Sequence, residues 1–148
     1  MDKKIILGND WKSLEFYKIV ELYDSVLWSA YTKDIDSLYR AYKNSSYVVF
    51  AQNNKGRLIG IARSISDDVS IHYLQDILIH PKFQKQGVGR MILNNVLSYY
   101  SHVRTHVLLT DDEEKQLIFY KSLGYSNTKE LKNNLLNVFV KMKNLTLS

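Results

Sequence analysis

The stretch that decides the fold is Asp76-Ile77-Leu78-Ile79-His80-Pro81-Lys82-Phe83-Gln84-Lys85-Gln86-Gly87-Val88-Gly89-Arg90. Its apolar first part predicts the end of a β-strand, and His80-Pro81 marks a turn. The two glycines then open a helical pattern that continues to about Tyr100. Glycines allow a close approach of the backbone to a ligand, and the first turn of a helix presents amide N–H groups that favour an anion. The sequence therefore predicts an anion-binding loop, and a pyrophosphate suits it.

The loop does not match two other phosphate-binding patterns. A Walker A loop requires a Lys-Ser/Thr pair after its last glycine, and this pair is missing. A dinucleotide-binding fingerprint requires a third glycine, but position 92 is Ile. Taken alone, the two glycines are also compatible with a plain helix start that binds nothing.

A second element lies downstream at Phe119-Tyr120-Lys121-Ser122-Leu123-Gly124-Tyr125. Together the two stretches resemble the GCN5-related N-acetyltransferases (GNAT). In that family Gln/Arg-x-x-Gly-x-Gly/Ala follows a strand, and Phe-Tyr-x-x-x-Gly-Phe comes later. Gln84, Gly87 and Gly89 match the first pattern in order and spacing. The resemblance covers residues 47–142 and is more specific than either stretch alone.

The hydrophobic periodicity predicts a mixed α/β fold. The resemblance implies the GNAT acyl-CoA N-acyltransferase fold, in which helices flank a twisted, mostly antiparallel sheet and two central strands splay apart. With no repeat, linker or low-complexity tract, residues 1–148 are expected to form a single domain. Strands are expected at residues 5–7, 47–51, 58–63, 71–79, 106–109 and 136–142, and helices at 13–26, 34–44, 87–100 and 113–122.

Composition narrows the class of protein. The 148 residues lack cysteine, which excludes disulfides, thiolate zinc sites and a cysteine nucleophile, and we expect no metal. No apolar segment approaches the roughly 20 residues that span a bilayer, and the first residues lack a signal peptide's apolar region. A cytoplasmic protein is therefore expected. The net charge of +5 favours anions, but the lysines are scattered, so nucleic acid is not expected as the main ligand.

The resemblance implies acetyl-CoA as cosubstrate. In this family the pantetheine arm lies between the two splayed strands, here 71–79 and 106–109. Main-chain groups of Ile77, Leu78 and Ile79 are expected to pair with its amides. The expected pyrophosphate-binding residues are Gln84, Lys85, Gln86, Gly87, Val88, Gly89 and Arg90.

The expected reaction is direct attack of an amine on the thioester. Tyr120 stands where the family often has its general acid, although a tyrosine packed against Phe119 at the core edge is the alternative. Asp76 is a carboxylate in an apolar strand, which suggests a functional cavity. It is a candidate base or amine-attracting group, or else a partner of Arg63 in an ion pair. His72 and His80 are further candidates for the base.

The acceptor would be a primary amine of a small molecule or protein. Trp28 and Tyr31 lie between the first two expected helices, where the family builds its acceptor wall, although they could equally join that helix to the core. The acidic run 111–114 could face a cationic substrate, but charging the start of the next helix explains it better. A non-catalytic acyl-CoA-binding module is the alternative function, and a homodimer is compatible with the family.

Overall fold

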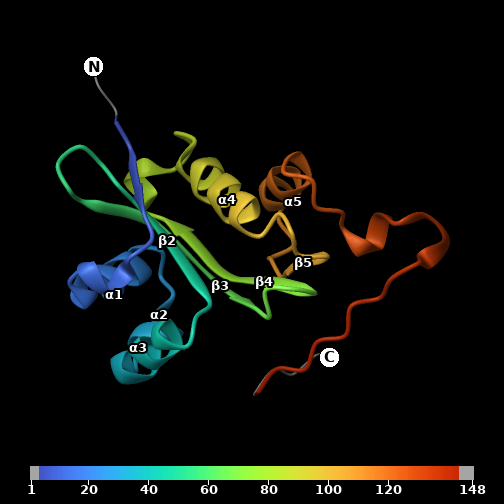
Figure 1. Ribbon diagram of the computed structural model, residues 1–148, viewed down its shortest axis with the longest axis horizontal. Coiled ribbons are helices and arrows are strands. Elements are labelled where there is room, and N and C mark those ends of the chain that lie inside the picture. The colour runs from blue at the N-terminus through green and yellow to red at the C-terminus, as the bar shows by residue number, and fades with distance from the viewer. Residues whose placement is uncertain (1–3, 144–148) are drawn as a thin grey trace. The chain divides into compact units, whose positions relative to one another are not determined.

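The computed structural model describes residues 4–143, which form two compact units, Met1–Leu109 and Thr110–Ser148. A single domain over residues 1–148 stays a prediction. The first unit contains β1 (Ile6–Gly8), α1 (Phe16–Ser25), α2 (Ser29–Thr32), α3 (Ile35–Lys43), β2 (Tyr47–Gln52), β3 (Leu58–Ser66), β4 (Ile71–Ile79), α4 (Val88–Tyr99) and β5 (Thr105–Leu108), with 3-10 helices at Trp11–Ser13 and Pro81–Phe83 (Figure 1). The second contains α5 (Glu114–Ser122) and 3-10 helices at Thr128–Glu130 and Lys132–Asn134.

The sheet follows the order of the chain, β1-β2-β3-β4-β5. The first three pairings are antiparallel, and β4 pairs with β5 in parallel. A mixed, mostly antiparallel sheet is therefore confirmed. The bounds of β4, Ile71–Ile79, are those expected from its apolar run.

The two strands at the end of the sheet part along their length. Ile71 to Leu74 pair with Thr105 to Leu108. Beyond Leu74, β4 continues to Ile79 but has no β5 partner within residues 4–143. Its backbone groups on that edge are therefore open to another partner. The end of this pairing agrees with the expected splay, although β5 is the edge strand of the sheet and not a central one.

Helices cover both faces of the sheet in the first unit (Figure 1). On one face, α1 and α3 bury apolar and tyrosine side chains against β2, β3 and β4. On the other face, α4 packs closely because Gly60 of β3 has no side chain. A Cβ there would lie 2.7 Å from Cδ1 of Ile79 and 2.9 Å from Cδ1 of Ile92. Gly60 thus brings the helix that follows the glycine loop onto the sheet.

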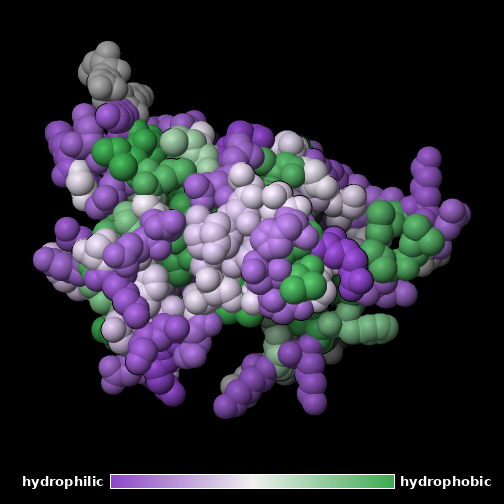
Figure 2. Space-filling view, viewed as in Figure 1, coloured by the Kyte–Doolittle hydropathy of each residue, from purple (hydrophilic) through white to green (hydrophobic). Residues whose placement is uncertain are grey.

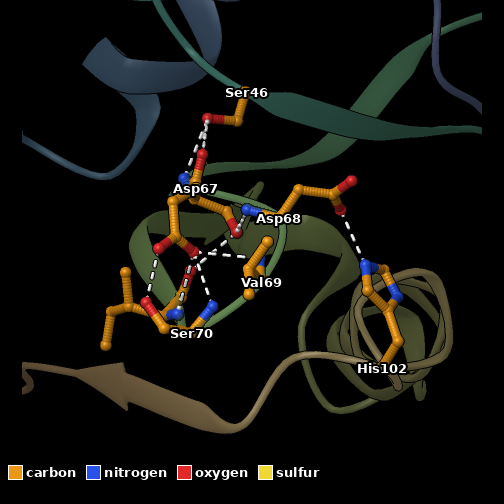
Figure 3. A network of polar contacts seen from close by, with 8 residues as sticks. Ser46, Asp67, Asp68, Val69, Ser70 and His102 are labelled. Carbon is orange, nitrogen blue, oxygen red and sulfur yellow. Dashed lines mark hydrogen bonds and ion pairs between the residues drawn. The ribbon is translucent and has the colours of Figure 1, made fainter.

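The turn from β3 to β4 is fixed by Asp67 (Figure 3). Its Oδ1 accepts the backbone N–H groups of Val69, Ser70 and Ile71 at 3.0, 2.8 and 3.1 Å. The hydrogen bond from the Ser70 hydroxyl, together with the one from the Ser70 backbone N–H, holds the pKa of Asp67 well below its usual range. Asp68 contacts His102 Nε2 at 2.7 Å. This network fixes where β4 begins relative to the end of α4.

In the second unit, Gly124 follows the end of α5 and closes its last turn. Gly124 has φ 96°, its N–H donates to Lys121 O, and the N–H of Tyr125 donates to Tyr120 O. This pair of bonds is the Schellman ending, which favours glycine.

The prediction of a strand at residues 136–142 is wrong, because these residues have no regular secondary structure. Their apolar and β-branched composition favours a strand, but a strand also needs a neighbouring edge for its backbone, and none pairs with it in the described part of the chain. Green hydrophobic side chains accordingly reach the surface of the molecule (Figure 2). Those exposed in residues 136–142 are Leu136, Val138, Phe139, Val140 and Met142.

Candidate functional site

The glycine loop joins β4 to α4 as the sequence predicted. Gly87 caps α4 with φ 84°, and a Cβ at this position would meet nothing within 4 Å. The N–H of Met91 makes the first backbone bond of the helix, to Gly87 O at 3.0 Å. The first-turn amides of Val88 and Gly89 precede it and have no acceptor inside the helix. The loop therefore presents N–H groups at the start of a 12-residue helix.

Two glutamine side chains hold the loop in shape. Gln84 Nε2 donates to Ile79 O at 3.0 Å, and Gln86 Nε2 donates to Lys82 O at 3.3 Å. Both contacts are made by side chains, so they leave the backbone amides of these residues to a ligand. Lys85 has a positive φ of 63°, which a non-glycine residue adopts at a cost. Lys82, Lys85 and Arg90 are exposed around the loop and make it electropositive.

The three β4 residues expected to bind the pantetheine arm lie just before this loop. Ile77 and Ile79 are half-buried and Leu78 is buried. All three pair with β3: Ile77 with Ala62, Leu78 with Ile61 and Ile79 with Gly60. All three lie beyond the last residue of β4 that pairs with β5. The open edge of β4 therefore leads directly to the glycine loop.

A bulge in β4 changes which side chains face which helices. Arg63 is opposite Asp76 and Ser64 is opposite Leu74, so Gln75 is an extra residue with no partner on β3. Opposed residues share a face of an antiparallel pair. Asp76 therefore shares the α1–α3 face with Arg63, whereas Leu74 shares the α4 face with Ser64. Without the bulge Asp76 would share the face of Leu74.

Asp76 is buried, with 3% of its surface exposed, and accepts hydrogen bonds at both oxygens. Oδ2 accepts Arg63 Nε at 2.6 Å and the Tyr23 hydroxyl at 2.9 Å. Oδ1 accepts the Tyr31 hydroxyl at 2.7 Å. The ion pair with Arg63, one of the alternatives for Asp76, is thus present. We call Asp76, Arg63, Tyr23, Tyr31 and Tyr42 the carboxylate network.

Tyr42 completes the network from α3. Its hydroxyl lies 2.8 Å from that of Tyr23. Because Tyr23 uses its hydrogen for Asp76, Tyr42 donates in this bond. Burial raises the pKa of both Tyr23 and Tyr42, so the two phenols remain protonated donors at neutral pH. The sequence did not identify Tyr23 and Tyr42 as site residues, because their helical spacing is also the spacing of core residues.

Tyr31 connects the network to the surface. It lies on the short helix α2, is half-buried, and accepts Gln75 Nε2 at 3.3 Å as well as donating to Asp76. Burial, and then the charge of Asp76, raises its pKa. Trp28 is 37% exposed beside it, with ring centroids 6.1 Å apart. The structure therefore brings three predicted site residues together, Trp28, Tyr31 and Asp76.

The two histidines considered as bases, His72 and His80, do not lie with Trp28, Tyr31 and Asp76. His72 is completely buried on the α4 face of β4. His80 lies in the turn before the glycine loop, where Nδ1 accepts the N–H of Lys82 at 3.1 Å and Nε2 faces Arg57 at 3.2 Å. Burial, Arg57 and Lys82 together lower the pKa of His80.

Tyr120 lies on α5 in the second unit. It is buried, and its ring contacts Phe119 at 5.2 Å and Tyr125 at 6.0 Å between centroids. Burial raises its pKa to about 12, so the phenol keeps its proton at neutral pH. Glu114 lies in the first turn of α5, in keeping with the helix-charging role of the acidic run, and Glu113 makes no side-chain cap.

No group of three or more His, Cys, Asp or Glu side chains within residues 4–143 could hold a metal ion. None of the helices described there is long and apolar enough to cross a membrane.

Comparison with known proteins gives consistent matches. Residues 19–146 match the family described as acetyltransferase (GNAT) domain. An uncharacterized N-acetyltransferase ycf52 of Pyropia yezoensis is 29% identical over 126 residues, which are 83% of this chain and 71% of that protein. The ycf52 protein of Gracilaria tenuistipitata var. liui is 32% identical and aligns over 76% of this chain and 62% of its own length.

Solved structures share the fold. A GNAT-family acetyltransferase from Streptococcus pneumoniae TIGR4 superposes with a TM-score of 0.80 at 20% identity, covering 95% of this chain and 99% of that one. Aminoglycoside N-acetyltransferase AAC(6')-Iy, solved in complex with CoA, superposes with a TM-score of 0.68 at 16% identity, covering 98% of each chain.

Proposed function

The chain belongs to the GNAT acetyltransferase family, whose activity is N-acetyl transfer, and from that premise we propose that it transfers an acetyl group from acetyl-CoA to a primary amine. The observation that carries the proposal is the course of β4. Its edge opens beyond Leu74 and leads into a glycine loop that presents helix N-terminal amides. An extended amide-containing arm that ends in a pyrophosphate has the chemistry to fit both parts.

The course of β4 supports the following assignment of cofactor-binding residues. Main-chain groups of Ile77, Leu78 and Ile79 bind the pantetheine amides. The loop amides and the nearby cations bind the pyrophosphate; the residues concerned are Gln84, Lys85, Gln86, Gly87, Val88, Gly89 and Arg90. An anion at this helix start is favoured by the helix dipole and by the absence of a side chain at Gly87.

Acetyl-CoA supplies a thioester, whose C–S bond breaks as the amine nitrogen bonds to the carbonyl carbon. The amine loses a proton and the sulfur gains one. Tyr120 is the proposed donor to sulfur. Burial keeps its hydrogen in place at neutral pH, although a pKa of about 12 makes it a weaker acid than an exposed tyrosine.

Asp76 is proposed to act on the amine side of the reaction. Its oxygens already accept three hydrogen bonds, so any amine proton would reach it through Tyr31, the half-buried member of the network. Trp28 and Tyr31 are proposed to form the acceptor wall. Their aromatic faces suit an amine bearing a cation or an apolar arm.

A matched pair of glycine substitutions tests the cofactor loop. Gly87→Ala and Gly56→Ala both add a Cβ at a positive φ, 84° and 78°, where nothing lies within 4 Å. Each costs about 1 kcal/mol of stability. Only Gly87→Ala places a methyl group in the glycine loop. We expect at least a tenfold rise in the Kd for CoA, measured by calorimetry, for Gly87→Ala alone. Equal Kd values for both variants and the wild type would place the cofactor elsewhere.

A second matched pair tests the proton donor. Tyr120→Phe and Tyr125→Phe each remove one phenol hydroxyl from the second unit, and burial raises both pKa values to about 12. General acid catalysis contributes roughly 10²- to 10⁴-fold. We expect a loss in kcat of that order for Tyr120→Phe and less than twofold for Tyr125→Phe. Unchanged turnover in Tyr120→Phe would remove this role.

Release of free thiol from acetyl-CoA across a panel of amines tests the activity itself. The panel contains aminoglycosides, polyamines, amino acids and peptides with free N-termini. Amine-dependent release above background would reject a non-catalytic acyl-CoA-binding module. A thermal shift with an oligonucleotide but none with acetyl-CoA would reject the proposed function.

A further inference from the structure

A row of three polar side chains crosses the α4 face of the sheet and takes no part in the proposed reaction. It consists of Ser64 on β3, His72 on β4 and His106 on β5, and we call it the histidine row. His72 Nε2 lies 2.8 Å from Ser64 Oγ, and His72 Nδ1 lies 3.0 Å from His106 Nδ1. His72 is completely buried and stacks on Tyr100, at the end of α4, with ring centroids 4.4 Å apart.

The row lies where β4 and β5 are about to part. His72 is opposite His106, and only two further pairs follow, ending with Leu74 opposite Leu108. The β5 strand has four residues, and a parallel pairing of that length provides few backbone bonds. The bond between the two rings therefore adds a side-chain link between β5 and β4 at this point.

A contact between two ring nitrogens requires one hydrogen between them. Burial, followed by the proximity of His106, lowers the pKa of His72 to about 4, and burial also lowers the pKa of His106. Both rings are consequently neutral at pH 7, and each has one N–H and one bare nitrogen. One Nδ1 can then donate and the other accept, while the Ser64 hydroxyl takes the complementary role at Nε2. Ser64 and Tyr100 contact His72, and the backbone of Val103 hydrogen-bonds His106.

We propose that His106 is a positioning residue whose bond to His72 fixes β5 beside β4 at the start of their gap, and so sets the gap's width for the arm of CoA. The inference rests on the proposed function, because that function assigns the gap to the pantetheine arm. Loss of the bond leaves a buried ring nitrogen of His72 without a partner and releases β5 from β4. The predicted consequence is weaker CoA binding without loss of any group that touches CoA.

Two substitutions of similar size separate the bond from the volume of the side chain. In His106→Asn the amide group occupies the place of Nδ1 and can pair with His72, whereas His106→Leu has nearly the same shape and no polar atom. We expect the Kd for CoA at pH 7.5, measured by calorimetry, to rise at least fivefold in His106→Leu and less than twofold in His106→Asn. Ser13→Ala is the control for general loss of stability, because the Ser13 hydroxyl donates to Asp10 O at 2.6 Å in the 3-10 helix Trp11–Ser13, outside both β4 and β5. Its Kd should not change.

The outcomes distinguish the inference from the function it rests on. If the wild type binds CoA and His106→Leu binds it equally well, the inference is wrong and the proposed function stands. If the wild type does not bind CoA, both fail. Should His106→Leu not fold, His106→Gln takes its place, because its amide lies one bond beyond the Nδ1 position, and it should bind CoA less tightly than His106→Asn.

Nuclear magnetic resonance of the wild type gives an independent readout. Long-range ¹⁵N–¹H correlations distinguish protonated from bare ring nitrogens. At pH 7 we expect one hydrogen between the two Nδ1 atoms, on His72 or on His106. Two bare Nδ1 atoms, or two charged rings, would overturn the inference.

Discussion

The two faces of β4 differ in chemistry although they belong to one strand. Toward α4, the strand presents apolar residues and His72, and leads into a loop whose ligand-binding groups are backbone amides. Toward α1 and α3, it buries Asp76, which accepts hydrogen bonds from side chains of three elements, α1, α2 and β3. The bulge at Gln75 allows both arrangements, because it changes the alternation of side chains within one strand.

The difference shows which kind of site depends on local sequence. The loop needs two glycines at the correct spacing and a helix start, and all of this lies within one short stretch. The carboxylate network needs Tyr23, Tyr31 and Tyr42 to meet Arg63 and Asp76, and these residues come from distant parts of the chain. Substitutions on the network face should therefore affect stability most, and those on the loop face should affect CoA binding.

The largest expected effect on stability comes from removing one half of the buried ion pair. Arg63→Met leaves the Asp76 carboxylate buried without its cation, which typically costs about 3–5 kcal/mol. Urea unfolding at pH 7.5 measures this loss. The double variant Arg63→Met with Asp76→Leu should recover most of it, because no unpaired charge remains. If the double variant is as unstable as the single one, packing rather than charge accounts for the cost.

The next effect is a loss of stability in acid on the α4 face. Unfolded histidine takes up a proton near pH 6.5, whereas burial holds the pKa of His72 at about 4. Stability from this residue is therefore complete above pH 6.5 and is lost as the pH falls toward 4, by up to about 3 kcal/mol. Urea unfolding at pH 7.5 and pH 5 should show a smaller difference in His72→Gln than in the wild type. If both proteins lose the same free energy of unfolding between pH 7.5 and pH 5, His72 is not the cause of the loss.

A pair of glycines separates stability from cofactor binding. Gly60→Ala would force a Cβ to within 2.7 Å of Ile79 Cδ1, and Gly8→Ala would force one to within 2.4 Å of Phe50 Cζ. Overpacking of this kind costs about 1–3 kcal/mol in either case. Only Gly60 contacts the start of α4, through Val88 and Ile92. Calorimetry should show weaker CoA binding in Gly60→Ala alone. A similar loss in Gly8→Ala would mean that global destabilisation explains both.

The smallest expected change in stability is on the acceptor side. Tyr31→Phe removes one hydrogen bond to the charged Asp76 carboxylate, which contributes about 1.5 kcal/mol for a half-buried donor. The KM for the amine identified in the panel should rise severalfold while the Kd for CoA stays constant. A changed Kd for CoA with a constant KM for the amine would place Tyr31 on the wrong side of the site.

Local signals in the sequence predicted local features correctly. The bounds of β4 followed from its apolar run between polar turns. Asp34 caps α3 by accepting the N–H of Ser37 at 3.1 Å, and Gly124 follows the end of α5, and both residue types favour these positions. Each of these features depends on residues that are neighbours in the chain.

Features that depend on distant partners were not predicted, or remained alternatives. Helix α2 has four residues, too few to show a period. The bulge at Gln75 becomes visible only when β3 lies beside β4. For Asp76, the sequence left a base and an ion pair equally open, since only the fold shows that Arg63 is opposite it. Residues 136–142 illustrate the converse, because a strand-like composition did not produce a strand.

The most direct measurement is a titration of ¹⁵N-labelled protein with CoA, followed by the backbone amide resonances. The account predicts saturable shifts that are largest in Val88 and Gly89, with a second set in Ile77 to Ile79, and smaller shifts in the carboxylate network. Saturable binding with no shift in the loop or in β4, or no binding at millimolar CoA, would contradict it.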